Sequence, residues 1–194
     1  MTEIQPDNLA DCEHGLPEGA SIVEPGLVEM PQPPGIFAGV LFDRAEEYLN
    51  AVQRLQNQDE KADLYVCYFL ATHAVELLLK AFLAVKGSTK RDLREAKIRH
   101  NLPSLLEHAI AMGLAAPQDF SELVNVLHNM NDRHDFRYPT GYQLHLPPPL
   151  YCLDVIRPVG EVIGKITKVE RVEAHVEWAG ATRHLKGFKI RWSD

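Results

Sequence analysis

Residues 131–139, NDRHDFRYP, place two arginines beside a histidine and two aspartates. Metal-independent cleavage of RNA needs a base for the ribose 2′-hydroxyl, an acid for the leaving oxygen and a cation over the phosphate. His134 can carry a proton near neutral pH. Arg133 and Arg137 can each offer paired donors to a phosphate. These side chains therefore predict phosphate recognition, and they leave open whether acid–base chemistry accompanies it.

Residues 86–100 hold a second group of candidates, with six bases against two acids. His100 ends this stretch and is a further proton carrier for the same chemistry. Lys90, Arg91 and Arg94 could follow the phosphates of an RNA backbone, and such binding would weaken steeply with added salt. The simpler alternative is a solvated surface without a ligand.

A charged pair lies inside the most apolar segment, residues 62–86. Glu76 and Lys80 stand four positions apart with the acid first, the favourable order for an ion pair on a helix. Glu and Lys are rarely buried without partners. In one interpretation Glu76 binds Arg133 or Arg137 and fixes the packing of two helices. In the other, the pair lines a polar pocket.

The remaining binding candidates lie beside the arginines and are Asn131, Asp132 and Tyr138. The competing interpretation is a set of ion pairs within this segment that ties down a helix end. His128 and Asp132 fall on one helix face, but two possible ligands at helical spacing do not make a metal site. The sequence therefore predicts no metal and no other cofactor.

A framework of helices must position these side chains. In residues 62–86 a stripe of apolar residues recurs at steps of three and four, and apolar residues cover most of the remaining circumference. Such a helix has to lie among other helices. Asn101 is an expected N-cap, Gly87 and Gly113 are expected helix ends, and Pro158 is expected to kink or restart a helix. The sequence predicts helices at residues 36–57, 60–87, 101–113, from 118 into the polar stretch after 130, and 150–168.

The period changes near the end of the chain. Residues 172–178 and 188–192 alternate apolar and polar side chains, the pattern of a strand. We therefore predict a β-hairpin in residues 171–194. A solitary two-stranded hairpin is marginally stable, so it should pack on the helices, gain a strand from the N-terminal segment or pair with another subunit.

Residues 1–35 differ in composition from the rest of the chain. They contain seven acids, no Lys or Arg, and six of the 13 prolines. This composition predicts an extended or disordered acidic arm. The other 20 acids and 20 bases cancel, so the net charge of −7 does not exclude a nucleic-acid partner for the folded part, residues 36–170.

Length and cysteine content indicate the class of protein. A chain of 194 residues suggests one domain with appendages. Three widely spaced cysteines imply no disulfide framework and favour a reducing, cytoplasmic location. The acidic N-terminus lacks the features of a secretory signal. Polar residues interrupt the most apolar segment, so we expect no transmembrane span.

Three segments, in order, resemble a known superfamily. They are residues 74–83 (AVELLLKAFL), residues 100–109 (HNLPSLLEHA) and residues 131–139 (NDRHDFRYP). In this order and helical context the chain resembles the HEPN domain superfamily over about residues 36–170. This superfamily includes ribonuclease toxins paired with antitoxins and partners of minimal nucleotidyltransferases.

The resemblance implies an up-and-down helical bundle, commonly a dimer. Nuclease members carry an Arg followed after four to six residues by a His, near the start of the last core helix. Arg133 and the polar His134 match the first half of that motif. Tyr, Pro and Thr stand at positions 138–140, where the second half is expected. Arg94 and His100 have the required spacing but lie before the predicted third helix.

We therefore expect an all-α, HEPN-like up-and-down bundle of four to five helices with a small C-terminal β-hairpin. The leading hypothesis is recognition of RNA or nucleotide phosphate, with a metal-independent endoribonuclease of toxin–antitoxin or defence type as its catalytic form. The alternative is a non-catalytic interaction module that forms a homodimer and binds a nucleotidyltransferase, an antitoxin or another protein. We expect no membrane partner.

Overall fold

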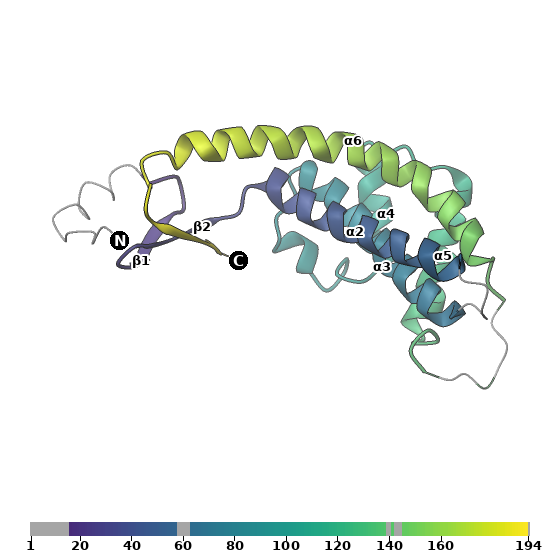
Figure 1. Ribbon diagram of the computed structural model, residues 1–194. Coiled ribbons are helices and arrows are strands. Elements are labelled where there is room, and N and C mark those ends of the chain that lie inside the picture. The colour runs from purple at the N-terminus through teal and green to yellow at the C-terminus, as the bar shows by residue number, and fades with distance from the viewer. Residues whose placement is uncertain (1–15, 58–62, 139–140, 142–144, 194) are drawn as a thin grey trace.

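A computed structural model describes residues 16–57, 63–138, 141 and 145–193. These residues form an all-α bundle with a small β element, as the sequence predicts (Figure 1). The helices are α2 (Pro34–Gln56), α3 (Leu64–Val85), α4 (Leu102–Ala111), α5 (Gln118–Asp132) and α6 (Pro149–Ala181), with the 3-10 turn η2 (Asp92–Arg94) before α4. The strands are β1 (Ser21–Glu24), β2 (Leu27–Pro31) and β3 (Lys189–Ser193).

α3 is the central helix of the bundle and contacts α2, α4, α5 and α6. Its side chains Leu78, Leu79 and Phe82 are at most 2% exposed. Among the described helices α3 is the one long and apolar enough to span a membrane, but 67% of its most apolar window is buried inside the bundle. Its apolar circumference thus fills the core, and the prediction that other helices surround it is confirmed.

The predicted signals at the helix ends are confirmed. The Asn101 side chain accepts a hydrogen bond from the Ser104 backbone N–H at 3.0 Å and caps α4. Gly87 and Gly113 directly follow the last turns of α3 and α4 with φ angles of 98° and 94°. Glycine adopts this left-handed conformation without steric cost, so both helices can end in a tight turn.

Glycines set the close approach of α2 and α6. A Cβ atom added at Gly35 would lie 2.3 Å from the carbonyl oxygen of Glu170. A Cβ added at Gly164 would lie 2.5 Å from the ring of Phe42. At Gly35 and Gly164 the backbone of one helix is thus in direct contact with atoms of the other. A larger side chain at either position would push the two helices apart.

The prediction of a hairpin in residues 171–194 is wrong in its first strand, which is the C-terminal part of α6. Residues 172–178, predicted as a strand, belong to a helix that runs to Ala181 and contains Pro158 in its interior. Val172 and Val176 are four positions apart, so they fit a helical face as well as an alternating strand. Ala174, between them, is buried and lies against the N-terminal end of α2, because it is 2.9 Å from the position of a Cβ on Gly35.

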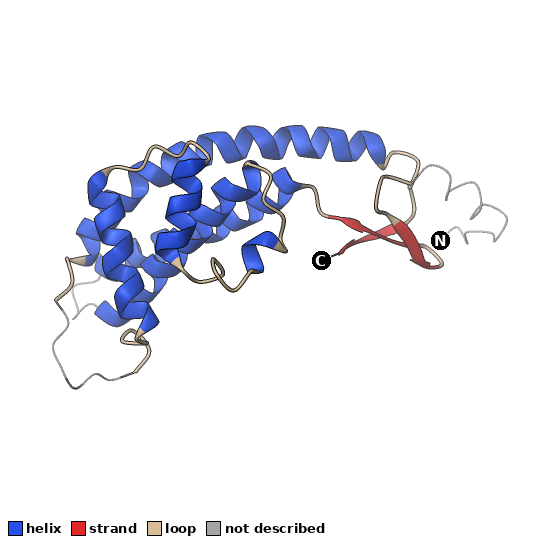
Figure 2. Cartoon of the chain, turned by 180° about the vertical axis from the view of Figure 1, so that it is seen from behind, coloured by secondary structure: helices blue, strands red, loops and turns tan. Residues whose placement is uncertain are grey.

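The second predicted strand is confirmed as β3, but its partner is not an adjacent segment. β3 pairs in parallel with β2, and β2 pairs antiparallel with β1, in the order β1-β2-β3. The predicted addition of a strand from the N-terminal segment is thus observed, while residues 1–15 of the expected arm lie outside the described residues. The sheet lies beyond the bundle at the C-terminal end of α6 (Figures 1 and 2), where the rings of Trp178 and Trp192 are 5.7 Å apart.

Candidate functional site

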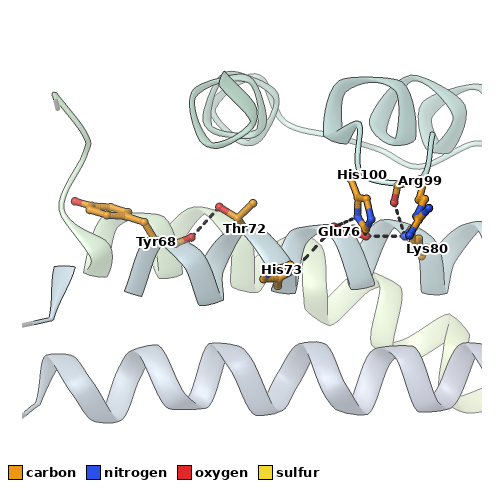
Figure 3. Close-up of polar contacts among 7 residues, drawn as sticks. All are labelled: Tyr68, Thr72, His73, Glu76, Lys80, Arg99 and His100. Carbon is orange, nitrogen blue, oxygen red and sulfur yellow. Dashed lines mark hydrogen bonds and ion pairs between the residues drawn. The ribbon is translucent and has the colours of Figure 1, made fainter. Parts of the chain in front are cut away.

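A cluster of ionisable side chains surrounds Glu76 on α3 (Figure 3). The Glu76 residue is 5% exposed. His100 Nδ1 lies 3.1 Å and 3.3 Å from its two carboxylate oxygens. Lys80 Nζ donates to Glu76 Oε1 at 2.6 Å and to the carbonyl oxygen of Arg99 at 2.6 Å. We call His73, Glu76, Lys80 and His100 the α3 cluster.

The loop between α3 and α4 brings His100 to α3. Thr89 and Asp92 exchange hydrogen bonds, from the Thr89 backbone N–H to Asp92 Oδ2 at 2.8 Å and from the Asp92 N–H to Thr89 Oγ1 at 3.1 Å. The hydrogen bond from the Thr89 backbone N–H is the main cause that lowers the pKa of the Asp92 carboxyl, and a hydrogen bond with the Thr89 side chain adds to the shift. Leu93 in η2 is 3% exposed and joins the core. The loop is therefore folded against α3 and holds its far end, at His100, over Glu76.

His73 extends the cluster along α3 by one turn. Its Nδ1 lies 3.9 Å from Glu76 Oε2, and its ring meets the Phe69 ring edge-on at 4.4 Å between centroids. Partial burial lowers the pKa of His73, the nearby Glu76 carboxylate opposes that shift, and Arg137 adds to it. The guanidinium carbon of Arg137 lies 5.5 Å from the Phe69 ring. Arg137 from the end of α5 therefore lies near the same face of α3.

The end of α5 has an unusual backbone at His134. His134 has a φ of 63°, the left-handed conformation that glycine occupies after α3 and α4. Its N–H donates to the carbonyl of Asn131 at 3.0 Å, and the N–H of Asp135 donates to the carbonyl of Met130 at 2.9 Å. This is the Schellman pattern. A residue other than glycine in this backbone conformation costs on the order of 1 kcal/mol or more in folding free energy. Such residues occur most often at functional sites.

The turn determines which side chains of this segment face solvent. Asp135 and Phe136 are buried, and the Phe136 ring stacks on Tyr68 at 5.7 Å between centroids. Arg133, His134 and Arg137 are exposed. The helix end is thus tied down by backbone hydrogen bonds and ring packing, and the two arginines face solvent.

The structure brings some of the predicted residues together and separates others. Glu76, Lys80 and His100 are in contact, so the polar cluster is observed. The interpretation that Glu76 binds Arg133 or Arg137 is wrong, because its carboxylate contacts Lys80, His100 and His73. The loop after α3 crosses this helix and supplies His100 as a partner for the buried Glu76 carboxylate, so no arginine from the segment after α5 is needed.

The other predicted binding residues lie outside this cluster. Lys90 and Arg91 line a cavity near the N-terminus of α2. Arg94 closes η2 through its N–H, which donates to the Arg91 carbonyl at 3.1 Å. Tyr138 is 67% exposed. Asp132 is exposed at the end of α5, and the buried Oδ1 of Asn131 has no hydrogen-bond partner among the described residues.

His73 was not among the site residues predicted from the sequence. The signal was present in the spacing of His73, Glu76 and Lys80, which share a helix face. Among the residues that the structure describes, no group of three His, Cys, Asp or Glu side chains is placed to hold a metal ion.

The contact between Glu76 and His100 has a definite chemical consequence. A carboxylate beside Nδ1 favours the tautomer that carries its proton there, which leaves Nε2 as the acceptor. The His100 side chain is 61% exposed and that of Glu76 is 7% exposed. A buried carboxylate thus orients a solvent-accessible imidazole, an arrangement suited to proton transfer.

One comparison with known proteins gives a match. The family model described as HEPN domain matches residues 38–169, which is more than half of the chain. No curated protein and no solved structure matches the chain significantly.

Proposed function

The chain belongs to the HEPN domain family, and from this premise we propose that it recognises phosphate groups of RNA or nucleotides at the α3 cluster. The observation that carries the proposal is the contact between the buried Glu76 carboxylate and the exposed His100 ring. The family match supports a helical module with a ribonuclease-like or nucleotide-related role.

Arginine from the end of α5 supplies the cation for a phosphate. Arg137 is exposed and near His73 and Phe69, so a phosphate over this part of α3 meets a guanidinium group. Arg133, four positions earlier in the sequence, is also exposed. Guanidinium groups bind phosphate through paired hydrogen bonds, which a neutral side chain cannot replace.

In the catalytic form of this function, His100 Nε2 takes the proton of the ribose 2′-hydroxyl. The 2′-oxygen then attacks the phosphorus, the bond to the 5′-oxygen breaks, and a 2′,3′-cyclic phosphate forms. The departing 5′-oxygen takes a proton from an acid, for which His134 is the candidate. Glu76 acts through His100 as a positioning residue.

Binding is tested with a fluorescent RNA oligonucleotide and the Arg133→Ala/Arg137→Ala double variant. Both side chains are exposed, so thermal stability should change little. We expect at least about a tenfold loss of affinity, the effect of losing a charge-assisted contact. An affinity equal to that of the unmodified chain would rule out phosphate recognition at this face.

Cleavage is tested with the same RNA in the presence of EDTA. If the chain cleaves RNA, His100→Ala should reduce the rate by about 10²-fold or more, as expected for loss of a general base. His108→Ala is a matched control, because His108 is an exposed histidine whose Nδ1 contacts the Ser104 carbonyl within α4. Equal rates in both variants would exclude His100 as the base.

An exposed row of valines on α6 favours a second candidate, a non-catalytic interaction module. Val162, Val169, Val172 and Val176 are 45%, 57%, 64% and 68% exposed and recur at steps of seven, three and four. This is the spacing of a seam between two helices. The module would form a homodimer through α6 and bind a nucleotidyltransferase, an antitoxin or another protein.

Sedimentation of Val169→Lys/Val176→Lys tests the second candidate. The unmodified chain should be a dimer at micromolar concentration and this variant a monomer, since two lysines cannot be buried in an apolar seam. Val40→Lys is the control, as Val40 is 47% exposed on α2. A monomeric unmodified chain, or a double variant that is still dimeric, would exclude dimerisation through this row.

A further inference from the structure

A cavity of about 260 Å³ opens where three segments distant in sequence meet. Pro31 and Phe37 contribute from the end of β2 and the start of α2. Residues 88–91 contribute from the loop after α3, and Ser193 contributes from the end of β3. The volume is close to the lower limit for pockets that enclose small organic ligands.

The lining of this cavity combines two kinds of side chain. Pro31, Pro34 and Phe37 are apolar, whereas Lys90 and Arg91 are cationic and follow the hydroxyl residues 88 and 89. Among the described lining residues there are two cations and no acid. The cavity therefore suits a ligand with a flat apolar part and a negatively charged part.

Lys90 contacts the other two segments that line the cavity. Its Nζ lies 5.5 Å from the centroid of the Phe37 ring and 3.3 Å from the carbonyl oxygen of Ser193. The carbonyl satisfies part of the ammonium group, which has three donors. The ammonium charge is thereby held over the Phe37 ring, so an anion drawn to it lies close to this aromatic side chain.

Arg91 supplies the second charge and is exposed. The neighbouring Asp92 carboxylate accepts the Thr89 N–H at 2.8 Å, and the charge of Arg91 adds a smaller lowering of its pKa. Because Arg91 is exposed, its guanidinium group can turn to a phosphate in the paired geometry that this side chain favours.

We propose that this cavity binds one nucleoside phosphate, with the base against Phe37 and the phosphate on Lys90 and Arg91. Proteins that bind single-stranded nucleic acids combine aromatic stacking of the bases with cationic contacts to the phosphates. The ligand is a free nucleotide or the end of an RNA strand, which share this chemistry. The proposal rests on the proposed function for the ligand class but uses a separate site.

The separation follows from the length of α3. Glu76 and Val85, the last residue of α3, are nine positions apart, which is about 14 Å along a helix. The side chains exchanged at one site therefore do not line the other, so each site can be probed with its own variants.

The test is titration of the full chain with AMP by calorimetry, with adenosine and inorganic phosphate as partial ligands and a 5′-phosphorylated RNA trimer as the strand end. We expect one AMP per chain, weaker binding of adenosine and of phosphate, and at least about a tenfold loss of AMP affinity in Arg91→Ala and in Phe37→Leu. Lys97→Ala removes a base of the same loop that does not line the cavity and should bind AMP normally.

Several outcomes would overturn the proposal. One is AMP binding that is unchanged in Arg91→Ala and Phe37→Leu, and another is RNA binding by a chain that does not bind AMP. Displacement of AMP by an acidic peptide that binds more tightly would instead assign the cavity to a protein segment.

The variants also distinguish the two sites. Loss of AMP binding in Arg133→Ala/Arg137→Ala alone would place the nucleotide at the α3 cluster. Conversely, if the cavity variants lose AMP while this double variant keeps its RNA affinity, the cavity stands and the function proposed for the α3 cluster fails.

Discussion

His100 and Glu76 are 24 positions apart in the sequence, yet the imidazole Nδ1 lies 3.1 Å from the carboxylate. The carboxylate is fixed from the other side by Lys80, whose ammonium group is also held by the carbonyl of Arg99. A buried acid anchored in this way gives the exposed ring one orientation before any ligand arrives. Preorganisation of this kind reduces the entropy cost of binding and of proton transfer.

The buried pair predicts a large effect on stability. In Glu76→Leu the Lys80 side chain, 12% exposed, loses its counter-charge, and the free energy of unfolding should fall by about 3 kcal/mol. Glu76→Gln keeps an acceptor for Lys80 and should lose less. Glu76→Leu/Lys80→Met should recover much of the loss, because no buried charge remains. Denaturation by urea measures all three, and equal losses in the Leu and Gln variants would contradict the argument.

His73 predicts a dependence of stability on pH. Burial lowers its folded pKa below the ordinary value of 6.5. Between the two values the unfolded chain binds more protons than the folded chain, so the contribution of His73 is complete above about pH 6.5 and is lost as pH falls through the folded pKa. Since the chain has eight other histidines, the measurement is the difference in unfolding free energy between the chain and His73→Gln. A difference that does not change between pH 7.5 and pH 5 would refute this assignment.

The helices of the bundle could be predicted because their causes are local. Leucine spacing, the Asn101 cap and the glycines after α3 and α4 each act within a few residues. The helical end of α6 could not be predicted, because Val172 and Val176 fit a helical pattern and an alternating strand pattern equally well. In the folded chain this part of α6 packs on Gly35 through Glu170 and Ala174, a contact between segments distant in the sequence.

The site was only partly predictable for the same reason. Glu76 and Lys80 stand out in sequence because they interrupt an apolar helix. Their contact with His100 depends on how the loop after α3 folds, and that is set by Leu93 in the core and by the turn at Thr89. The parallel pairing of β2 with β3 joins segments about 160 positions apart, as the ion pair between Glu29 and Arg191 does, and no local pattern encodes it.

The left-handed backbone at His134 predicts that a glycine there is more stable. His134→Gly removes the steric cost of the side chain and should raise the free energy of unfolding by about 1 kcal/mol, net of the added entropy of the unfolded chain. Gly113→Ala is the mirror control at the corresponding position after α4 and should lower it by about the same amount. Thermal unfolding measures both. A less stable His134→Gly would mean that the ring contributes more than the strain costs.

The crossing of α2 and α6 predicts opposite effects for two alanine substitutions. Gly35→Ala places a methyl group 2.3 Å from the Glu170 carbonyl, which forces the helices apart and should cost about 2 kcal/mol. Gly180→Ala lies in α6 with no atom within 4 Å of the new methyl group, so it should stabilise the chain by up to about 1 kcal/mol. Chemical denaturation compares them, and a stable Gly35→Ala would show that the two helices can separate freely.

The parallel pairing of β2 and β3 has a consequence for biosynthesis. β2 leaves the ribosome early with β1 available for one of its edges, but its other edge has no partner until residues 189–193 have been made. By then the intervening helices can already have assembled from contacts closer in sequence. The sheet is then the last structure to close, and until it does the edge of β2 is open to strands of other chains. The seven acids of the first 35 residues repel such strands from a neighbouring nascent copy, since each copy carries the same charge.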